Sequence, residues 1–219
     1  MTKVKAVLFD LDGVIFDTEH QYSVFWGEQC KLFHPEDPGL EQRIKGQTLN
    51  QIYEQLFSGS LEPMRPVVTE RLNAFEAAMT FDYVPGFMDF LRMLHQDGIK
   101  TAVVTSSNRE KMKAVYKQHP DFTQLFDSIL TSEDFTGSKP DPSCYLTAAR
   151  QLNVTPDACI VFEDSFNGLR AGKAAEMRVV GLSTTNPAAA IAPLCDVVIS
   201  DYHELEKIDF LLNLNSAAL

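Results

Sequence analysis

Two acidic residues, separated by a single residue, stand where the first apolar run of the chain ends. The run Val4–Phe9 leads directly into Asp10, Leu11, Asp12 and Gly13. If the run is a strand of a parallel sheet, both carboxylates lie at its carboxyl end, where open α/β sheets bind their ligands. Residues of these types at this spacing allow acid–base or metal chemistry. The plainer alternative is an acidic turn with a glycine corner.

A group of polar residues follows a second apolar run. The run Thr101–Val104 leads into Thr105, Ser106, Ser107 and Asn108. Hydroxyls and backbone N–H groups at the start of a helix form a site for an anion. Alternatively, Ser107 or Asn108 caps the helix that follows. Both interpretations can hold at once.

Two further loops carry charged residues. Lys139 lies in a stretch with prolines at 140 and 142, which restricts its freedom and suits a fixed point charge, although most loop lysines are merely solvated. Glu163 and Asp164 follow the apolar run Cys159–Phe162. Acids at this position could also simply favour the N-terminus of the next helix.

A stripe of small residues follows these acids. Gly168, Ala171, Gly172 and Ala175 recur at the spacing of one helical face. We expect this stripe to let the helix lie close to the sheet, as a packing feature rather than a chemical one.

Short apolar runs alternate with helical patterns along most of the chain. The runs are continuous, as expected of strands that are buried on both faces; they are Val4–Phe9, Thr101–Val104, Ser128–Leu130, Cys159–Phe162, Val179–Leu182 and Asp196–Ile199. Helical spacing begins at Phe87, with Gly98 as a C′ residue, and again at Met112. Pro142 should open a third helix that runs to about Leu152. This alternation predicts an α/β fold with a doubly wound parallel sheet.

One long segment breaks the alternation. Residues 18–83 contain no convincing strand, and two helical faces stand out, one at Tyr22, Phe25, Trp26 and Phe33 and one from Val68 to Met79. We predict an all-helical cap domain at 18–83, inserted into a core domain formed by 1–17 and 84–219.

Composition excludes several classes of function. The 219 residues are 45% apolar and carry 19 basic against 30 acidic side chains, a net charge of −11. Such an acidic surface argues against nucleic-acid binding. The four cysteines form no CxxC pair, and no apolar stretch is long enough for a membrane span. We expect a reduced, cytoplasmic monomer with no membrane partner.

The ordered set of four loops resembles the haloacid dehalogenase superfamily of phosphotransferases. Its motifs are matched here by DLDGV, by TS at 105–106, by KP at 139–140 and by EDS at 163–165. The match covers the whole core and the position of the insert. It is closest to the branch of β-phosphoglucomutase and the sugar phosphatases, through DLDGVIFDT and EDSFNGLRA.

The resemblance implies a role for each motif residue. Asp10 would be the nucleophile that forms an aspartyl-phosphate, and Asp12 the general acid and then the base. Mg²⁺ would be held by Asp10, the backbone carbonyl of Asp12 and Asp164, with Glu163 as a direct ligand or a supporting residue. Thr105, Ser106 and Lys139 would bind the phosphoryl group of a small phosphorylated metabolite.

The resemblance also indicates which insert residues could contact the substrate. Thr18, His20 and Tyr22 lie where a lid hinge meets the leaving-group pocket, although Tyr22 could equally pack inside the insert. Gln47 and Thr48 fall in a loop that enters the site in the mutases. The mutase arginine that grips the far phosphate aligns with Leu49, and Arg43 and Lys45 should point elsewhere.

The sequence therefore predicts a Mg²⁺-dependent phosphatase, with a β-phosphoglucomutase-type mutase as the alternative. A dehalogenase would lack Asp12, and a phosphonatase needs a cap lysine, for which Lys31 and Lys45 show no motif. A receiver module is about half this length and spaces its acids differently. A pseudo-enzyme is disfavoured because every motif residue is intact. The sequence leaves the phosphate ester itself open.

Overall fold

A six-stranded parallel sheet forms the centre of the larger part of the molecule. The computed structural model describes residues 2–45, 47–208 and 212. The strand order is β3-β2-β1-β4-β5-β6. The strands are β1 (Ala6–Phe9), β2 (Lys100–Val104), β3 (Ser128–Leu130), β4 (Cys159–Glu163), β5 (Arg178–Leu182) and β6 (Val197–Ile199). The predicted doubly wound sheet is confirmed, with the first strand beginning at Ala6 rather than Val4 and the last at Val197 rather than Asp196.

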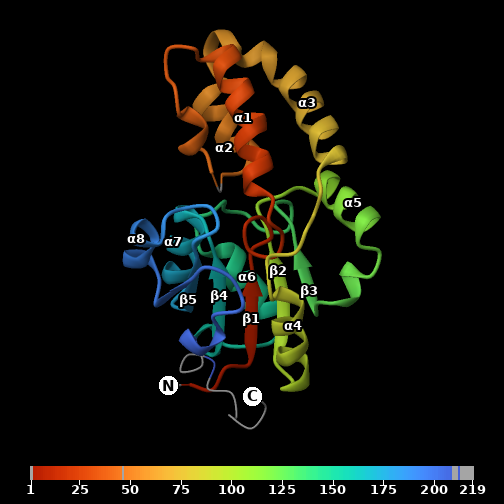
Figure 1. Ribbon diagram of the computed structural model, residues 1–219, viewed down its shortest axis with the longest axis vertical. Coiled ribbons are helices and arrows are strands. Elements are labelled where there is room, and N and C mark those ends of the chain that lie inside the picture. Colours follow the sequence, from red (N-terminus) through yellow and green to blue (C-terminus); the bar gives the residue numbers. More distant parts are fainter. Residues whose placement is uncertain (1, 46, 209–211, 213–219) are drawn as a thin grey trace.

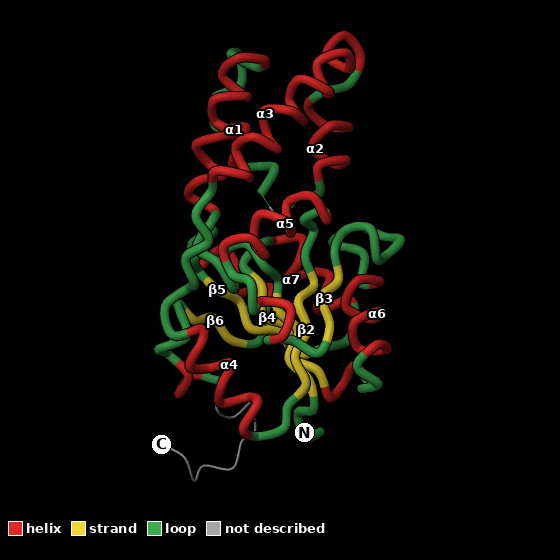
Figure 2. The backbone as a smooth tube through the Cα atoms, turned by 90° about the vertical axis from the view of Figure 1, so that its right-hand side faces the viewer, coloured by secondary structure: helices red, strands yellow, loops and turns green. Residues whose placement is uncertain are grey.

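Helices cover both faces of this sheet, which explains why its strands are continuously apolar. Successive residues of a strand point to opposite faces. In β1, Val7 and Phe9 belong to the cluster on one face, whereas Ala6 and Leu8 belong to the cluster on the other. Figure 2 shows α4 and α6 on opposite sides of the sheet.

The core helices follow the predicted spacing closely. They are α4 (Phe87–Gln96), α5 (Arg109–Gln118), α6 (Ser143–Gln151), α7 (Phe166–Ala174) and the short α8 (Ala188–Ile191). After α4, Gly98 has φ 67° and its N–H bonds the His95 carbonyl, as predicted for a C′ glycine. Asn108 caps α5 by accepting the Lys111 N–H at 2.9 Å. Pro142 is the N-cap of α6 and lies just before its first residue.

Between β1 and α4 the chain forms a separate helical insert. Its helices are α1 (Glu19–Phe33), α2 (Leu49–Leu56) and α3 (Arg65–Ala78), with short 3-10 turns at Leu40–Gln42 and Gly59–Met64. They pack around their own cluster, which includes Trp26, Ile52 and Leu72. Figure 1 shows these three helices beyond the ends of the strands. The domain boundaries at 18–83 stay a prediction, and this separate cluster supports them.

The two connections between insert and core run side by side. The Asp17 N–H donates to the Asp82 carbonyl and the Val84 N–H to the Ile15 carbonyl, both at 2.9 Å. The chain therefore enters and leaves the insert at one place. No helix among the described residues has both the length and the apolar character needed to cross a bilayer.

Candidate active site

The predicted motif residues, except the fully buried Glu163, line one cavity between the sheet and the insert. The strands point their carboxyl ends toward α1, α2 and α3 (Figure 1). A cavity of about 370 Å³ lies there, lined from the core by Asp10, Asp12, Thr105, Ser106, Lys139 and Asp164 and from the insert by Tyr22, Lys45, Gln47, Thr48, Leu49 and Glu76. It lies at the ends of β1 and β4, the central neighbours of the sheet, which is the expected position for a ligand in this topology.

Lys139 joins two carboxylates at the floor of the cavity. Its ammonium lies 2.5 Å from Asp10 Oδ1 and 2.6 Å from Glu163 Oε1, and it donates to the Val104 carbonyl at 3.0 Å. The side chain is 1% exposed. Burial alone would lower the pKa of Lys139, but the charges of Asp10 and Glu163 raise it above its ordinary value. Lys139 is therefore the fixed positive charge that the prolines suggested.

Glu163 is held by protein donors on both of its oxygens. Besides Lys139, Oε1 accepts the Tyr145 hydroxyl at 2.8 Å. The other oxygen, Oε2, accepts the Ser165 hydroxyl at 3.0 Å and the N–H groups of Asp164 and Ser165. The oxygens of Glu163 already accept hydrogen bonds from several protein donors, which leaves few lone pairs for another ligand. Glu163 therefore serves to hold Lys139.

The close approach of α7 to the sheet, expected from the stripe of small residues, brings Gly168 against a carboxylate of the site. A Cβ atom at this position would meet the Glu163 carboxylate, whereas one at Gly172 would meet Val179 and Val161 of the sheet. The stripe of small residues thus serves packing at Gly172 and makes room for a site carboxylate at Gly168.

Asp12 is surrounded by three donors. Thr18 donates to its Oδ1 at 2.6 Å, and Ser107 donates to its Oδ2 at 3.0 Å. Lys111, on α5, forms an ion pair with the same Oδ2. The sequence did not single out Lys111, since a lysine four positions past Ser107 looks like the exposed lysines around it.

The segment after β5 completes the site and was missed. Thr185 hydrogen-bonds Asp164 Oδ2, and the Asn186 side chain donates to the Asp164 carbonyl at 3.0 Å. Thr184 donates to the Gly13 carbonyl at 2.6 Å. The signal was present, because this polar run also stands at the carboxyl end of a strand.

The buried carboxylates fit a divalent cation. Oxygens of Asp10, Glu163 and Asp164 lie within 4.8 Å of one another. Burial raises the pKa of Asp10 to about 7 against the opposing effect of Lys139, and the charges of Glu163 and Asp12 add to the rise. Burial also raises the pKa of Asp164, together with the charges of Glu19, Glu163 and Asp10. A cation with oxygen ligands, such as Mg²⁺, would offset this repulsion.

Hydroxyls line the side of the cavity beside Asp10. Thr105 accepts the Ser107 N–H on its hydroxyl at 3.0 Å. The Ser106 hydroxyl oxygen is buried and has no hydrogen-bond partner among the described residues, although Ser106 lines the cavity. Burying a hydroxyl without a partner is costly, so a ligand oxygen at this place would satisfy it.

The candidate residues of the insert separate into two groups. Tyr22, Gln47 and Thr48 line the cavity, and their contact with a substrate stays a prediction. Thr18 is buried against Asp12 instead, and His20 is exposed and does not line the cavity.

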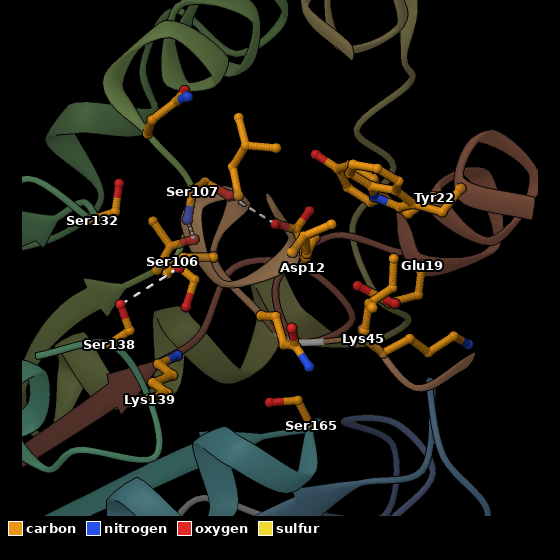
Figure 3. A pocket seen from close by; sticks show the side chains of 18 of the residues that line it. Asp12, Glu19, Tyr22, Lys45, Ser106, Ser107, Ser132, Ser138, Lys139 and Ser165 are labelled. Atoms are coloured by element: carbon orange, nitrogen blue, oxygen red, sulfur yellow. Dashed lines mark hydrogen bonds between the residues drawn. The ribbon is translucent and has the colours of Figure 1, made fainter. Parts of the chain in front are cut away.

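Lys45 lines the cavity, which corrects the expectation that it points elsewhere (Figure 3). That expectation assumed a helical offset, but α2 begins only at Leu49, after the N-cap Thr48. Leu49 itself also lines the cavity.

Known proteins of one family share this architecture. The sequence profile of the haloacid dehalogenase-like hydrolases matches residues 7–182. The chain belongs to this family. The family, and with it the hydrolase class that the motifs predicted, is confirmed.

Relatives among the haloacid dehalogenase-like hydrolases match nearly the whole chain. A validoxylamine A 7'-phosphate phosphatase of Streptomyces hygroscopicus subsp. limoneus is 34% identical, over 92% of this chain and 95% of the relative. A β-phosphoglucomutase of Mycobacterium tuberculosis is 31% identical, over 93% and 92%. The crystal structure of a β-phosphoglucomutase from Clostridium difficile has a TM-score of 0.77 at 25% identity, over 96% of this chain and 97% of that one.

Proposed function

We propose that the protein is a Mg²⁺-dependent phosphatase that hydrolyses a small phosphate monoester, such as a sugar phosphate, through an aspartyl-phosphate on Asp10. The observation that carries this proposal is the floor of the cavity, where Lys139 lies 2.5 Å from Asp10 and Asp12 follows two residues after Asp10. The proposed nucleophile, the proton carrier and the fixed cation thus line the same cavity.

The residues that would hold Mg²⁺ are the carboxylates of Asp10 and Asp164, with the backbone carbonyl of Asp12. We assign Glu163 to the support of Lys139, because its oxygens already accept protein donors. When bound, the ion supplies positive charge against the crowded carboxylates and the phosphoryl oxygens.

The reaction proceeds in two displacements. Asp10 attacks the phosphorus while the bond to the leaving oxygen breaks, and Asp12 gives that oxygen a proton. Asp12 then takes a proton from water, which attacks the phosphorus of the aspartyl-phosphate, so that inorganic phosphate leaves and Asp10 is regenerated. Lys139, Thr105 and Ser106 stabilise the charge on the transferring group.

The insert closes the cavity from above and contributes the groups that face the leaving alcohol. Gln51 of α2 donates to the Lys139 carbonyl at 3.1 Å, and Thr48 Oγ1 lies 3.5 Å from Ser138 Oγ. These contacts support a lid that excludes water while the site is occupied. The similarity to a validoxylamine A 7'-phosphate phosphatase supports a small carbohydrate-like phosphate as substrate. A cytoplasmic monomer stays a prediction.

The direct test is a phosphate-release assay over a broad panel of phosphate esters with Mg²⁺. We expect release from at least one class of small monoester by the wild-type protein and none by Asp10→Asn. Release by neither protein from any ester would contradict the proposed function.

A mutase of the β-phosphoglucomutase type is the second candidate. The observation in its favour is Lys45, a positively charged side chain of the insert that lines the cavity. Nevertheless, Leu49 stands where the mutase arginine aligns, and a bidentate grip on a second phosphate is a property of arginine. We therefore expect water, and not a sugar, to take the phosphoryl group. The assay supplies β-glucose 1-phosphate, Mg²⁺ and a trace of glucose 1,6-bisphosphate. Glucose 6-phosphate appearing faster than free phosphate would favour the mutase.

A further inference from the structure

One lysine of α5 lies inside the molecule, where it contacts the proposed proton carrier. The side chain of Lys111 is 2% exposed, whereas that of Lys113, two residues along the same helix, is 70% exposed. The Lys111 ammonium pairs with Asp12 Oδ2 and donates to the Ser107 hydroxyl at 3.0 Å. Ser107 in turn donates to the same carboxylate oxygen. Lys111 and Ser107 therefore fix Oδ2 from two directions.

The helical insert covers this lysine from the other side. The Lys111 ammonium lies 4.7 Å from the centre of the Tyr22 ring of α1, within the range of a cation–π contact. The Tyr22 hydroxyl donates to Glu76 Oε1 of α3 at 2.8 Å. Glu76 is itself a buried carboxylate, and its charge attracts Lys111. Residues of two insert helices thus hold a core lysine in place.

The arrangement leaves Asp12 with one defined orientation. Thr18 holds Oδ1, and Lys111 with Ser107 holds Oδ2. An unheld carboxylate would sample several side-chain rotamers, and proton transfer depends on the correct placement of the donor. Lys111 reaches Asp12 only from α5, while Tyr22 and Glu76 reach Lys111 only from the insert. The position of the insert is thereby linked to that of Asp12.

We propose that Lys111 is a positioning residue for Asp12, and that Tyr22 and Glu76 of the insert keep it in position. The proposal rests on the proposed function of Asp12 as the proton donor to the leaving oxygen. Lys111 acts through Asp12 and does not itself touch the reacting atoms.

The test compares two esters of nearly equal shape, phenyl phosphate and p-nitrophenyl phosphate. The p-nitrophenolate leaves without needing a proton. The phenolate is a poorer leaving group, so its departure depends on the proton from Asp12. For a reaction through aspartyl-phosphate, kcat/KM reports the steps up to the transfer to Asp10. With Lys111→Met we expect kcat/KM for phenyl phosphate to fall by about 10- to 100-fold and that for p-nitrophenyl phosphate by less than about threefold, since a positioned acid contributes about 10²–10⁴-fold.

The matched control is Lys113→Met, which removes the exposed lysine of the same helix and should leave both values unchanged. Glu76→Gln keeps the shape of a side chain that does not contact Asp12. The Glu76→Gln variant should also lose more kcat/KM for phenyl phosphate than for p-nitrophenyl phosphate, but by a smaller factor than Lys111→Met. If Lys111→Met does not fold, Glu76→Gln provides the test of the positioning role.

Equal losses on both esters in Lys111→Met, or in Glu76→Gln where the former does not fold, would overturn the positioning role. Equal values for Lys111→Met and wild type on both esters would overturn it as well. If the wild-type protein releases no phosphate from any ester, the proposed function fails instead. The two failures are therefore distinguishable.

Discussion

A Cβ atom placed on Gly168 would lie 1.7 Å from Oε1 of Glu163. Gly168, near the start of α7, therefore leaves the space that the Glu163 carboxylate needs in order to hold Lys139. Gly168→Ala should lower the free energy of unfolding by about 1–3 kcal/mol, as overpacking does, and should reduce phosphate release by displacing Lys139. Urea denaturation and the phosphate-release assay measure the two effects.

A second helical glycine provides the control for this substitution. A Cβ atom on Gly27 of α1 would come no closer than 3.9 Å to another residue. Gly27→Ala should therefore keep full activity and raise the free energy of unfolding by up to about 1 kcal/mol, the helix propensity difference. If Gly168→Ala behaves like Gly27→Ala, the role given to Gly168 is wrong.

Activity should require Mg²⁺, and excess Ca²⁺ should inhibit it. Asp10 and Asp164 offer the oxygen ligands that both ions accept, but Ca²⁺ prefers longer bonds and more ligands, and so would misplace the attacking oxygen. Phosphate release is measured with Mg²⁺, with Mg²⁺ and excess Ca²⁺, and in excess EDTA. Full activity in EDTA would contradict the assignment of a metal to these carboxylates.

The ionised carboxylate of Glu76 should lower the free energy of unfolding at neutral pH. Burial is the main cause that raises the pKa of Glu76 above 4.5, although Lys111 and the Tyr22 hydroxyl oppose it. Because the folded-state pKa is the higher one, the folded protein binds this proton more tightly, and stability falls as the pH rises above 4.5. Glu76→Gln should therefore raise the free energy of unfolding at pH 7, and the gain should shrink as the pH falls toward 4.5.

Urea denaturation of wild type and Glu76→Gln at several pH values measures this difference. Glu70→Gln, at an exposed position of the same helix α3, is the control and should change little. A Glu76→Gln gain that is constant over the pH range would show that titration of Glu76 is not its source.

The motif residues could be predicted because their positions follow from the strands. Asp10, Lys139 and Asp164 each stand in a loop at one edge of a parallel sheet, so that finding the apolar runs was enough to bring them together. The same rule applied to the run Val179–Leu182 would have found Thr185.

Other parts of the site depend on packing that no local pattern encodes. Lys111 shares the buried face of α5 with Met112 and Val115, whereas Lys113 is exposed, but this spacing alone does not show that Lys111 reaches Asp12. Lys45 was misplaced because a helix was assumed where the structure has a loop before α2. The role of Gly168 required the path of the Glu163 side chain, which sequence spacing does not give.

The central claim is that Asp10 carries the phosphoryl group, and Asp12→Ala allows a direct measurement. Without Asp12, water attacks the aspartyl-phosphate slowly, since one proton-transfer role contributes about 10²–10⁴-fold. p-Nitrophenyl phosphate can still phosphorylate the protein because its leaving group needs no proton. We predict that mass spectrometry of the acid-quenched Asp12→Ala protein finds one added phosphoryl group on the peptide that contains Asp10, and that Asp10→Asn in the same background removes it. Phosphoryl transfer to another residue, or turnover of p-nitrophenyl phosphate by the Asp10→Asn protein, would contradict the account.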